Sequence, residues 1–92
     1  MGTFKAPNKD PEAVLDYQIN WSDWLPDDDT ISTSTWVVPS GITEDSSSNT
    51  STAATIWLSG GTAGTGYAVK NHIVTGAGRE DDRTIYIWVR NR

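Results

Sequence analysis

The chain has 92 residues, no cysteine and a formal net charge of −5 at pH 7. This length predicts a single domain, and the lack of cysteine excludes disulfide bonds, thiolate-based zinc sites and thiol catalysis. Nucleic acids are bound mainly through Lys and Arg contacts to phosphate, whereas residues 10–69 hold nine carboxylates and no Lys or Arg, so no nucleic-acid partner is expected.

An extended N-terminal arm is predicted for residues 1–12, followed by one β-domain at residues 13–92. Pro7 and Pro11 each disfavour a helical conformation of the residue before them. Phe4 is the one strongly apolar side chain of the arm. We expect the arm to be disordered in the free protein and to become ordered on the sheet edge of a partner, with Phe4 as its anchor.

Six strands are predicted after the arm, from alternating apolar and polar residues and from the turn residues that bound each run. They cover residues 13–21, 30–38, 42–47, 52–59, 67–75 and 83–90. A seventh strand is possible where the register is ambiguous. The alternation directs these side chains to the core: Leu15, Tyr17, Ile19, Trp21, Ala54, Ile56, Leu58, Tyr67, Val69, Asn71, Ile73, Ile85, Ile87 and Val89. We also expect Trp36 in the core and Trp24 at one end of the domain.

A glycine-rich link at residues 60–66 joins the fourth and fifth predicted strands, and Tyr67 follows it directly. Immunoglobulin-like sandwiches place a tyrosine corner at this point, with a buried ring and a hydroxyl bonded to the crossing backbone. Strands joined by turns without any helical pattern are typical of an all-β domain. We therefore predict an immunoglobulin-like antiparallel β-sandwich of about seven strands.

No set of residues points to catalysis or to a cofactor. His72 is the single histidine, and the alternation puts it on the polar face of its strand, where we expect a solvated residue. The run Asp27-Asp28-Asp29 is interpreted as an acidic turn, because it lacks the alternate-position ligands and glycine of a calcium loop; a calcium site is the alternative. The glycine link lacks the Gly-Lys-Ser/Thr ending of a phosphate loop. We predict no catalytic, cofactor or metal site and no enzyme.

Two of the five tryptophans are predicted to face outward, because Trp57 and Trp88 are out of phase with the aliphatic residues of their strands. Trp, Tyr and Arg dominate protein–protein hot spots, so we predict one contact face that holds Trp57, Tyr86 and Trp88. The whole predicted interface consists of Phe4, Lys5, Pro7, Lys9, Trp57, Tyr86, Trp88 and Arg90. A carbohydrate-binding surface, with the rings stacked on sugars, is the alternative.

Neither a membrane span nor secretion through a cleaved signal is expected. No apolar run approaches the roughly 20 residues that a transmembrane helix needs, and no charged-then-apolar leader opens the chain. A chain without cysteine also suits a reducing cytosol. We therefore predict no membrane partner.

Several motifs together resemble the small tailed-phage virion proteins that are described as fibre-tail adaptors. The motifs are the run from Lys9 to Tyr17, Trp21-Ser22, Asp29-Thr30-Ile31, Trp36-Val37-Val38-Pro39-Ser40-Gly41-Ile42, the run from Trp57 to Tyr67, and Gly78-Arg79. The resemblance implies a non-enzymatic immunoglobulin-like sandwich that joins tail fibres to the tail. It also implies assembly in the host cytoplasm, a location in the virion tail, and several copies in a ring with the tail adaptor or nozzle and the tail fibre as partners.

Two other functions remain open from the sequence. A capsid decoration protein would have the same fold and would differ in its copy number per particle. A carbohydrate-binding module would use the exposed tryptophans and would bind cell-surface glycans.

Overall fold

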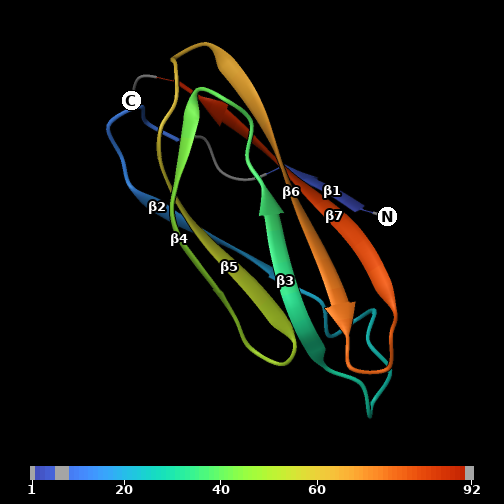
Figure 1. Ribbon diagram of the computed structural model, residues 1–92. Helices are drawn as coiled ribbons and strands as arrows, with labels where there is room; N and C mark the ends of the chain where they lie inside the picture. Colours follow the sequence, from blue (N-terminus) through green and yellow to red (C-terminus); the bar gives the residue numbers. More distant parts are fainter. Residues whose placement is uncertain (1, 6–8, 91–92) are drawn as a thin grey trace.

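Seven strands and no helix make up the part of the chain that the computed structural model describes, which is the backbone of residues 2–5 and 9–90 and the side chains of residues 9–90 (Figure 1). The strands are β1 (Gly2–Lys5), β2 (Leu15–Asn20), β3 (Ile31–Val37), β4 (Ile42–Asn49), β5 (Ala53–Gly60), β6 (Thr65–Thr75) and β7 (Glu80–Val89). The six predicted strands correspond to β2–β7. In the described residues, no helix is long and apolar enough to cross a membrane.

The strands form two sheets that pack face to face. One sheet has four strands in the order β1-β7-β6-β3, and the other has three in the order β2-β5-β4. Every pair is antiparallel except β1 and β7, which run parallel. The orders β2-β5-β4 and β7-β6-β3 match the two sheets of an immunoglobulin-type sandwich, in which the second, fifth and fourth strands face the third, sixth and seventh. The predicted fold class is confirmed.

The core lies between the two sheets and contains the residues that the alternation directed there. Ile56, Leu58, Val69, Ile73 and Ile87 have no exposed surface. Each such side chain stabilises the fold by roughly 1.5–3 kcal/mol relative to an exposed one. Leu15 is only partly buried but packs against the same core. The predicted facing of β2, β5, β6 and β7 is therefore confirmed.

Trp36 differs from its prediction as a core residue, because it is only partly buried. It faces inward in register with Asn71, but β3 is the edge strand of its sheet, so one side of the indole has no covering strand. Trp36 therefore packs against the core only at the open edge of the four-stranded sheet.

The tyrosine corner is present. The Tyr67 ring is 6 % exposed, and its hydroxyl accepts a hydrogen bond of 2.9 Å from the Thr62 amide in the link between the sheets. Gly61 has a φ of 99°, and a Cβ atom there would lie 2.8 Å from Val89 Cγ2. Glycine is required at this position both for the backbone conformation and for the close approach of the link to β7.

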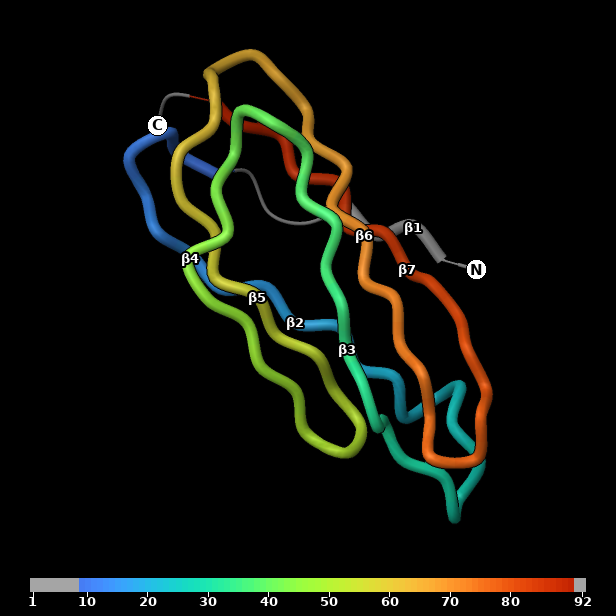
Figure 2. The backbone as a smooth tube through the Cα atoms, in the orientation of Figure 1, coloured from blue at the N-terminus to red at the C-terminus, as the bar shows by residue number. Residues whose placement is uncertain are grey.

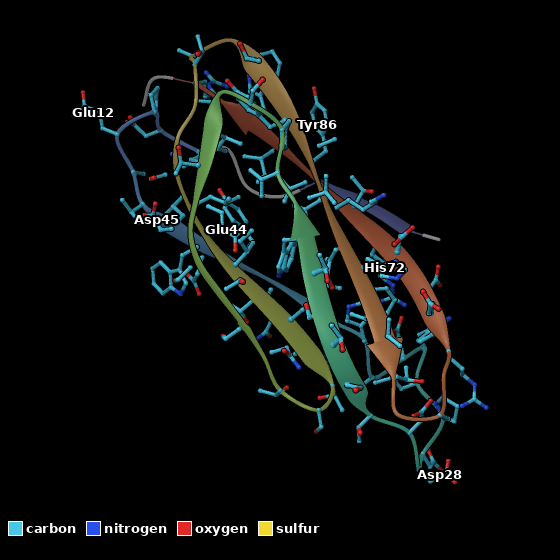
Figure 3. The ribbon with its side chains drawn as sticks, viewed as in Figure 1. Glu12, Asp28, Glu44, Asp45, His72 and Tyr86 are labelled. Atoms are coloured by element: carbon cyan, nitrogen blue, oxygen red, sulfur yellow. The ribbon has the colours of Figure 1, made fainter. Side chains whose placement is uncertain are left out.

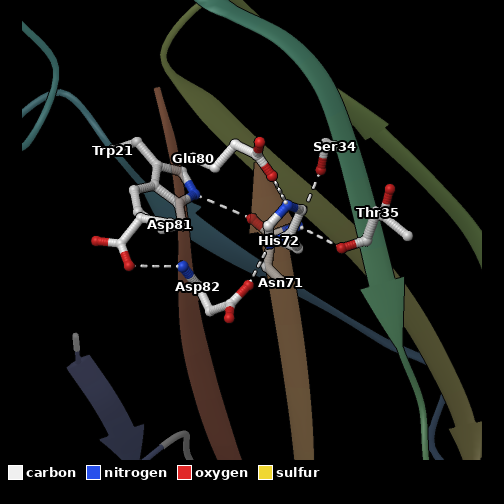
Figure 4. A network of polar contacts seen from close by, with 8 residues as sticks. All are labelled: Trp21, Ser34, Thr35, Asn71, His72, Glu80, Asp81 and Asp82. Carbon is white, nitrogen blue, oxygen red and sulfur yellow. Dashed lines mark hydrogen bonds and ion pairs between the residues drawn. The ribbon is translucent and has the colours of Figure 1, made fainter. Parts of the chain in front are cut away.

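Polar side chains connect the two sheets through the interior (Figure 4). Trp21, which directly follows β2, donates its indole N–H to Asn71 Oδ1 over 2.9 Å. Asn71 Nδ2 donates in turn to Ser34 Oγ at 2.9 Å and to the Thr35 carbonyl at 3.1 Å. Because each of these groups has a partner, Asn71 can be fully buried without leaving an orphaned amide.

The turn between β6 and β7 is held against the loop that precedes β3, at one end of the molecule (Figure 2). Asp29 accepts hydrogen bonds from the Ala77 amide at 3.2 Å and from Arg79 Nη1 at 2.8 Å. Asp27 and Asp28 are exposed, as an acidic turn predicts, but Asp29 is only 6 % exposed. Hydrogen bonds from Thr75 and then Arg79 lower the pKa of Asp29.

The N-terminal arm has a partner within its own chain, which the sequence did not predict. The backbone of Gly2–Lys5 forms β1 and pairs in parallel with β7, from Arg83 to Tyr86. The chain returns to the same edge at Lys9, which is bridged to Val89. The arm therefore supplies hydrogen-bonding partners to an edge of β7 that would otherwise be open. This pairing gives the arm a place in the free protein, where the sequence predicted disorder.

Candidate functional site

The most chemically distinctive polar group lies on the outer face of β6 and β7, around His72. Its Nδ1 lies 2.5 Å from Asp82 Oδ1, and its Nε2 lies 3.0 Å from Glu80 Oε1 (Figure 4). The hydrogen bonds to Asp82 and then Glu80 raise the pKa of His72. The sequence predicted a solvated residue here and missed both carboxylates, because they belong to the neighbouring strand.

The described residues hold no group of three or more His, Cys, Asp or Glu side chains that could bind a metal ion. The contacts of His72 are those of an ion pair when the imidazole is protonated. The features suited to recognition are the exposed aromatic residues on the outer faces of the two sheets.

One surface is the outer side of the three-stranded sheet, and we call it the acidic face; it consists of Asp16, Asp45, Trp57 and Ser59. Trp57 lies on the central strand β5, is 42 % exposed, and is in register with Asp16 of β2. Asp45 lies at the irregularity in β4 and accepts a 2.8 Å hydrogen bond from Ser59 Oγ. An exposed indole is thus flanked by a carboxylate on each side.

The second surface is one end of the outer side of the four-stranded sheet, and we call it the basic face. It consists of Val37, Ala68, Lys70, Tyr86, Trp88 and Arg90. Tyr86 is 39 % exposed and is in register with Ala68, while Trp88 is partly buried and is in register with Gly66. A Cβ atom at Gly66 would overlap the Tyr86 hydroxyl, so the phenol ring lies across the β6 backbone.

The prediction of one contact face with Trp57, Tyr86 and Trp88 is wrong. Trp57 belongs to β5 in one sheet, and the other two belong to β7 in the other sheet, so outward-facing side chains point away from each other. Asp45 and Tyr86, one from each face, lie on opposite sides of the molecule (Figure 3). Alternation distinguishes inward from outward residues but does not assign strands to sheets.

Lys9 was predicted at the interface and is instead fully buried. Its Nζ donates to the Gly60 carbonyl at 2.6 Å and to the Asp10 carbonyl at 3.0 Å. Burial lowers the pKa of Lys9, against the opposing effect of the carboxylates of Asp10 and Asp45. The ammonium group therefore attaches the arm to the end of β5 and is not available to a partner.

Of the remaining predicted contact residues, only Arg90 has a described side chain. Arg90 is exposed just beyond β7, and its amide donates to the Lys9 carbonyl at 2.9 Å. The side chains of Phe4 and Lys5, and the whole of Pro7, lie outside the described residues. Their part in an interface stays a prediction.

Comparison with known families gives a match that covers almost the whole chain. Residues 9–88 match the family described as podophage GP4 fiber-tail adaptor protein gp77. That description names a structural protein of the phage tail, whose partners are other tail proteins. No match was found among curated protein sequences.

Proposed function

Because this chain belongs to the podophage GP4 fiber-tail adaptor protein family gp77, we propose that it joins tail fibres to the tail as a non-enzymatic part of the virion. It acts in several copies, arranged as a ring, and contacts the tail adaptor or nozzle on one side and the fibre on the other. Assembly takes place in the host cytoplasm.

The observation that supports this function best is the position of the exposed aromatic residues on opposite sides of the sandwich. An adaptor that works in a ring must contact a neighbour on each of two sides at the same time, besides the tail and the fibre. Trp57 offers one contact area on the three-stranded sheet, and Tyr86 offers a second on the four-stranded sheet. Exposed Trp and Tyr side chains are the residue types that most often dominate binding energy at protein interfaces.

Hydrogen bonds in the interior connect the two sheets that carry the outer faces. The polar chain from Trp21 through Asn71 to β3 connects the sheets, and Asp29 with Arg79 connects the loops at one end. Contacts between buried, hydrogen-bonded groups hold the two outer faces in a constant relative position.

We further propose that the arm takes part in the contacts, through Phe4, Lys5 and Pro7. The exposed edge of β1 is available for another strand, because β1 pairs with β7 on one side and is the last strand of its sheet. Main-chain pairing to such an edge is a common mode of strand addition.

The test uses purified protein and phage particles assembled without it. We expect the protein to bind tails at a fixed copy number, and a chain without residues 1–8 to bind more weakly. The proposal fails if the protein ignores tails. Binding to capsids would indicate a decoration protein instead, and binding to cell-surface glycans that is lost with Trp57→Ala would indicate a carbohydrate-binding module.

A further inference from the structure

We propose that the acidic face of one copy docks on the basic face of the next copy, so that the chains associate head to tail. This inference rests on the proposed adaptor function and names the neighbour at these two faces: a second copy of this chain. The arm and the loops at the ends of the sandwich then remain free for the fibre and the tail.

The first support is charge complementarity between the two faces. The strands of the three-stranded sheet carry Asp16, Glu44 and Asp45 and no Lys or Arg. The basic face carries Lys70 and Arg90, both exposed; the carboxylates of Glu80 and Asp82 lie at the other end of the same sheet and pair with His72. Opposite charges on two surfaces of one chain steer unlike faces together, and like charges disfavour contact of a face with its own kind.

The second support is the pairing of aromatic residues with cations. Trp57 is 42 % exposed at the centre of the acidic face, with no cation in the strands beside it. Lys70, in register with Thr84, and Arg90, just beyond β7, are on the same outer face as the exposed Tyr86, on the opposite side of the molecule. A cation of one copy that stacks on Trp57 of the next would lie between the carboxylates of Asp16 and Asp45, although Asp45 already interacts with the ammonium group of Lys9.

The third support is size. The molecule measures 43 × 21 × 19 Å, so a long side offers an area on the order of 800–900 Å². Stable protein interfaces bury about 800 Å² on each partner. The basic face is only one end of such a side, so the contact is smaller than a standard interface and fits an association that depends on protein concentration.

The fourth support is the direction of the two faces. They point away from each other, because they lie on different sheets of the sandwich. A contact between unlike faces leaves one face of each kind free at the two ends of the assembly, so further copies can add. The assembly closes into a ring when the rotation from one copy to the next permits it.

The experiment measures the mass of the purified full chain in solution by sedimentation at rising protein concentration. We expect the native chain to associate, and the association to weaken by at least about tenfold when NaCl is raised from about 50 mM to about 500 mM. Asp16→Asn should weaken association, whereas the matched control Asp27→Asn, which makes the same charge change in an exposed turn, should not.

A mixing test identifies the head-to-tail geometry. The Trp57→Ala chain keeps its basic face, and the Tyr86→Ala chain keeps its acidic face. Each should be monomeric alone, while an equal mixture should form a one-to-one pair that grows no further, because both outer faces are then altered. Thr33→Ala, an exposed change on β3 outside both faces, should associate like the native chain.

Three results would overturn the inference: a native chain that stays monomeric at every concentration, a mixture that forms no pair, or one alanine variant that dimerises alone. These results are separate from the proposed function. A chain that stays monomeric yet binds tails at a fixed copy number would support the adaptor function and contradict the contact between copies. A chain that associates as described but does not bind tails would support the contact and contradict the adaptor function.

Discussion

The indole N–H of Trp21 and the side-chain oxygen of Asn71 are hydrogen-bonded at 2.9 Å across the interior, and both residues are fully buried. The two residues are 50 positions apart in the chain; Asn71 lies in β6 of the four-stranded sheet, and Trp21 directly follows β2 of the other sheet. This bond allows an amide to occupy a core position that the strand alternation would otherwise give to an aliphatic residue.

Asn71→Leu should therefore destabilise the protein although it makes the core more apolar. The substitution leaves the Trp21 N–H and the Thr35 carbonyl without their partner, and an orphaned buried group costs about 1–3 kcal/mol. We expect the free energy of unfolding in urea to fall by about 2–3 kcal/mol. Asn49→Leu, at an exposed amide, should change it by less than about 0.5 kcal/mol. Equal effects would contradict the role given to Asn71.

The tyrosine corner should make a measurable contribution through its hydroxyl alone. Tyr67→Phe removes the bond to the Thr62 amide and leaves the ring in place. We expect a loss of about 1 kcal/mol in the free energy of unfolding. Tyr86→Phe, which removes an exposed hydroxyl, is the control and should be nearly neutral. A Tyr67→Phe chain as stable as the native one would show that the link is held by packing only.

Two glycines with the same backbone conformation should respond differently to alanine. Gly61 has a φ of 99° and Gly78 a φ of 90°, so either substitution carries the left-handed penalty of about 1–2 kcal/mol. A Cβ atom at Gly61 also meets Val89, whereas one at Gly78 meets nothing within 4 Å. Thermal unfolding should show Gly61→Ala to be clearly less stable than Gly78→Ala. The same melting temperature for both would mean that the link can move away from β7.

His72 should make stability depend on pH. Asp82 and Glu80 raise the pKa of His72 in the folded protein above its value in the unfolded chain, so folding is favoured when the imidazole is protonated. This contribution is fully present below about pH 6.5, the ordinary histidine value, and is lost as the pH rises through the folded pKa. Urea unfolding from pH 6 to pH 9 measures it.

His72→Gln is the matched variant for that measurement. The difference in unfolding free energy between the native chain and His72→Gln should be larger at pH 6 than at pH 9. A difference that is constant with pH would mean that the two carboxylates do not stabilise the imidazolium.

The inner and outer faces of the strands could be predicted from the sequence because they depend on a local property. Side chains alternate along a strand with a period of two, so Ile85 and Ile87 are recognisable as inward and Tyr86 as outward from three neighbouring residues. The tyrosine corner at Tyr67 could also be predicted, because a glycine link directly before a tyrosine is a local pattern.

The contacts that the sequence did not predict join residues that are far apart in the chain. Asp29 pairs with Arg79 across 50 positions, and Lys9 donates to Gly60 across 51. In the sequence, Asp29 is the third of three aspartates and was predicted to be solvated, while Lys9 belongs to a polar arm and was predicted at an interface. No composition or spacing rule separates them from their exposed neighbours.

The sequence by itself determined the strands β2–β7, the facing of β2, β5, β6 and β7, and the tyrosine corner, since these follow from short-range periodicity and backbone chemistry. Only the tertiary structure decided which strands share a sheet. That decision separates Trp57 from Tyr86, covers Lys9 and pairs the arm with β7. The physical reason is that strand pairing joins backbone groups from distant segments, and the same alternating pattern is compatible with more than one sheet order.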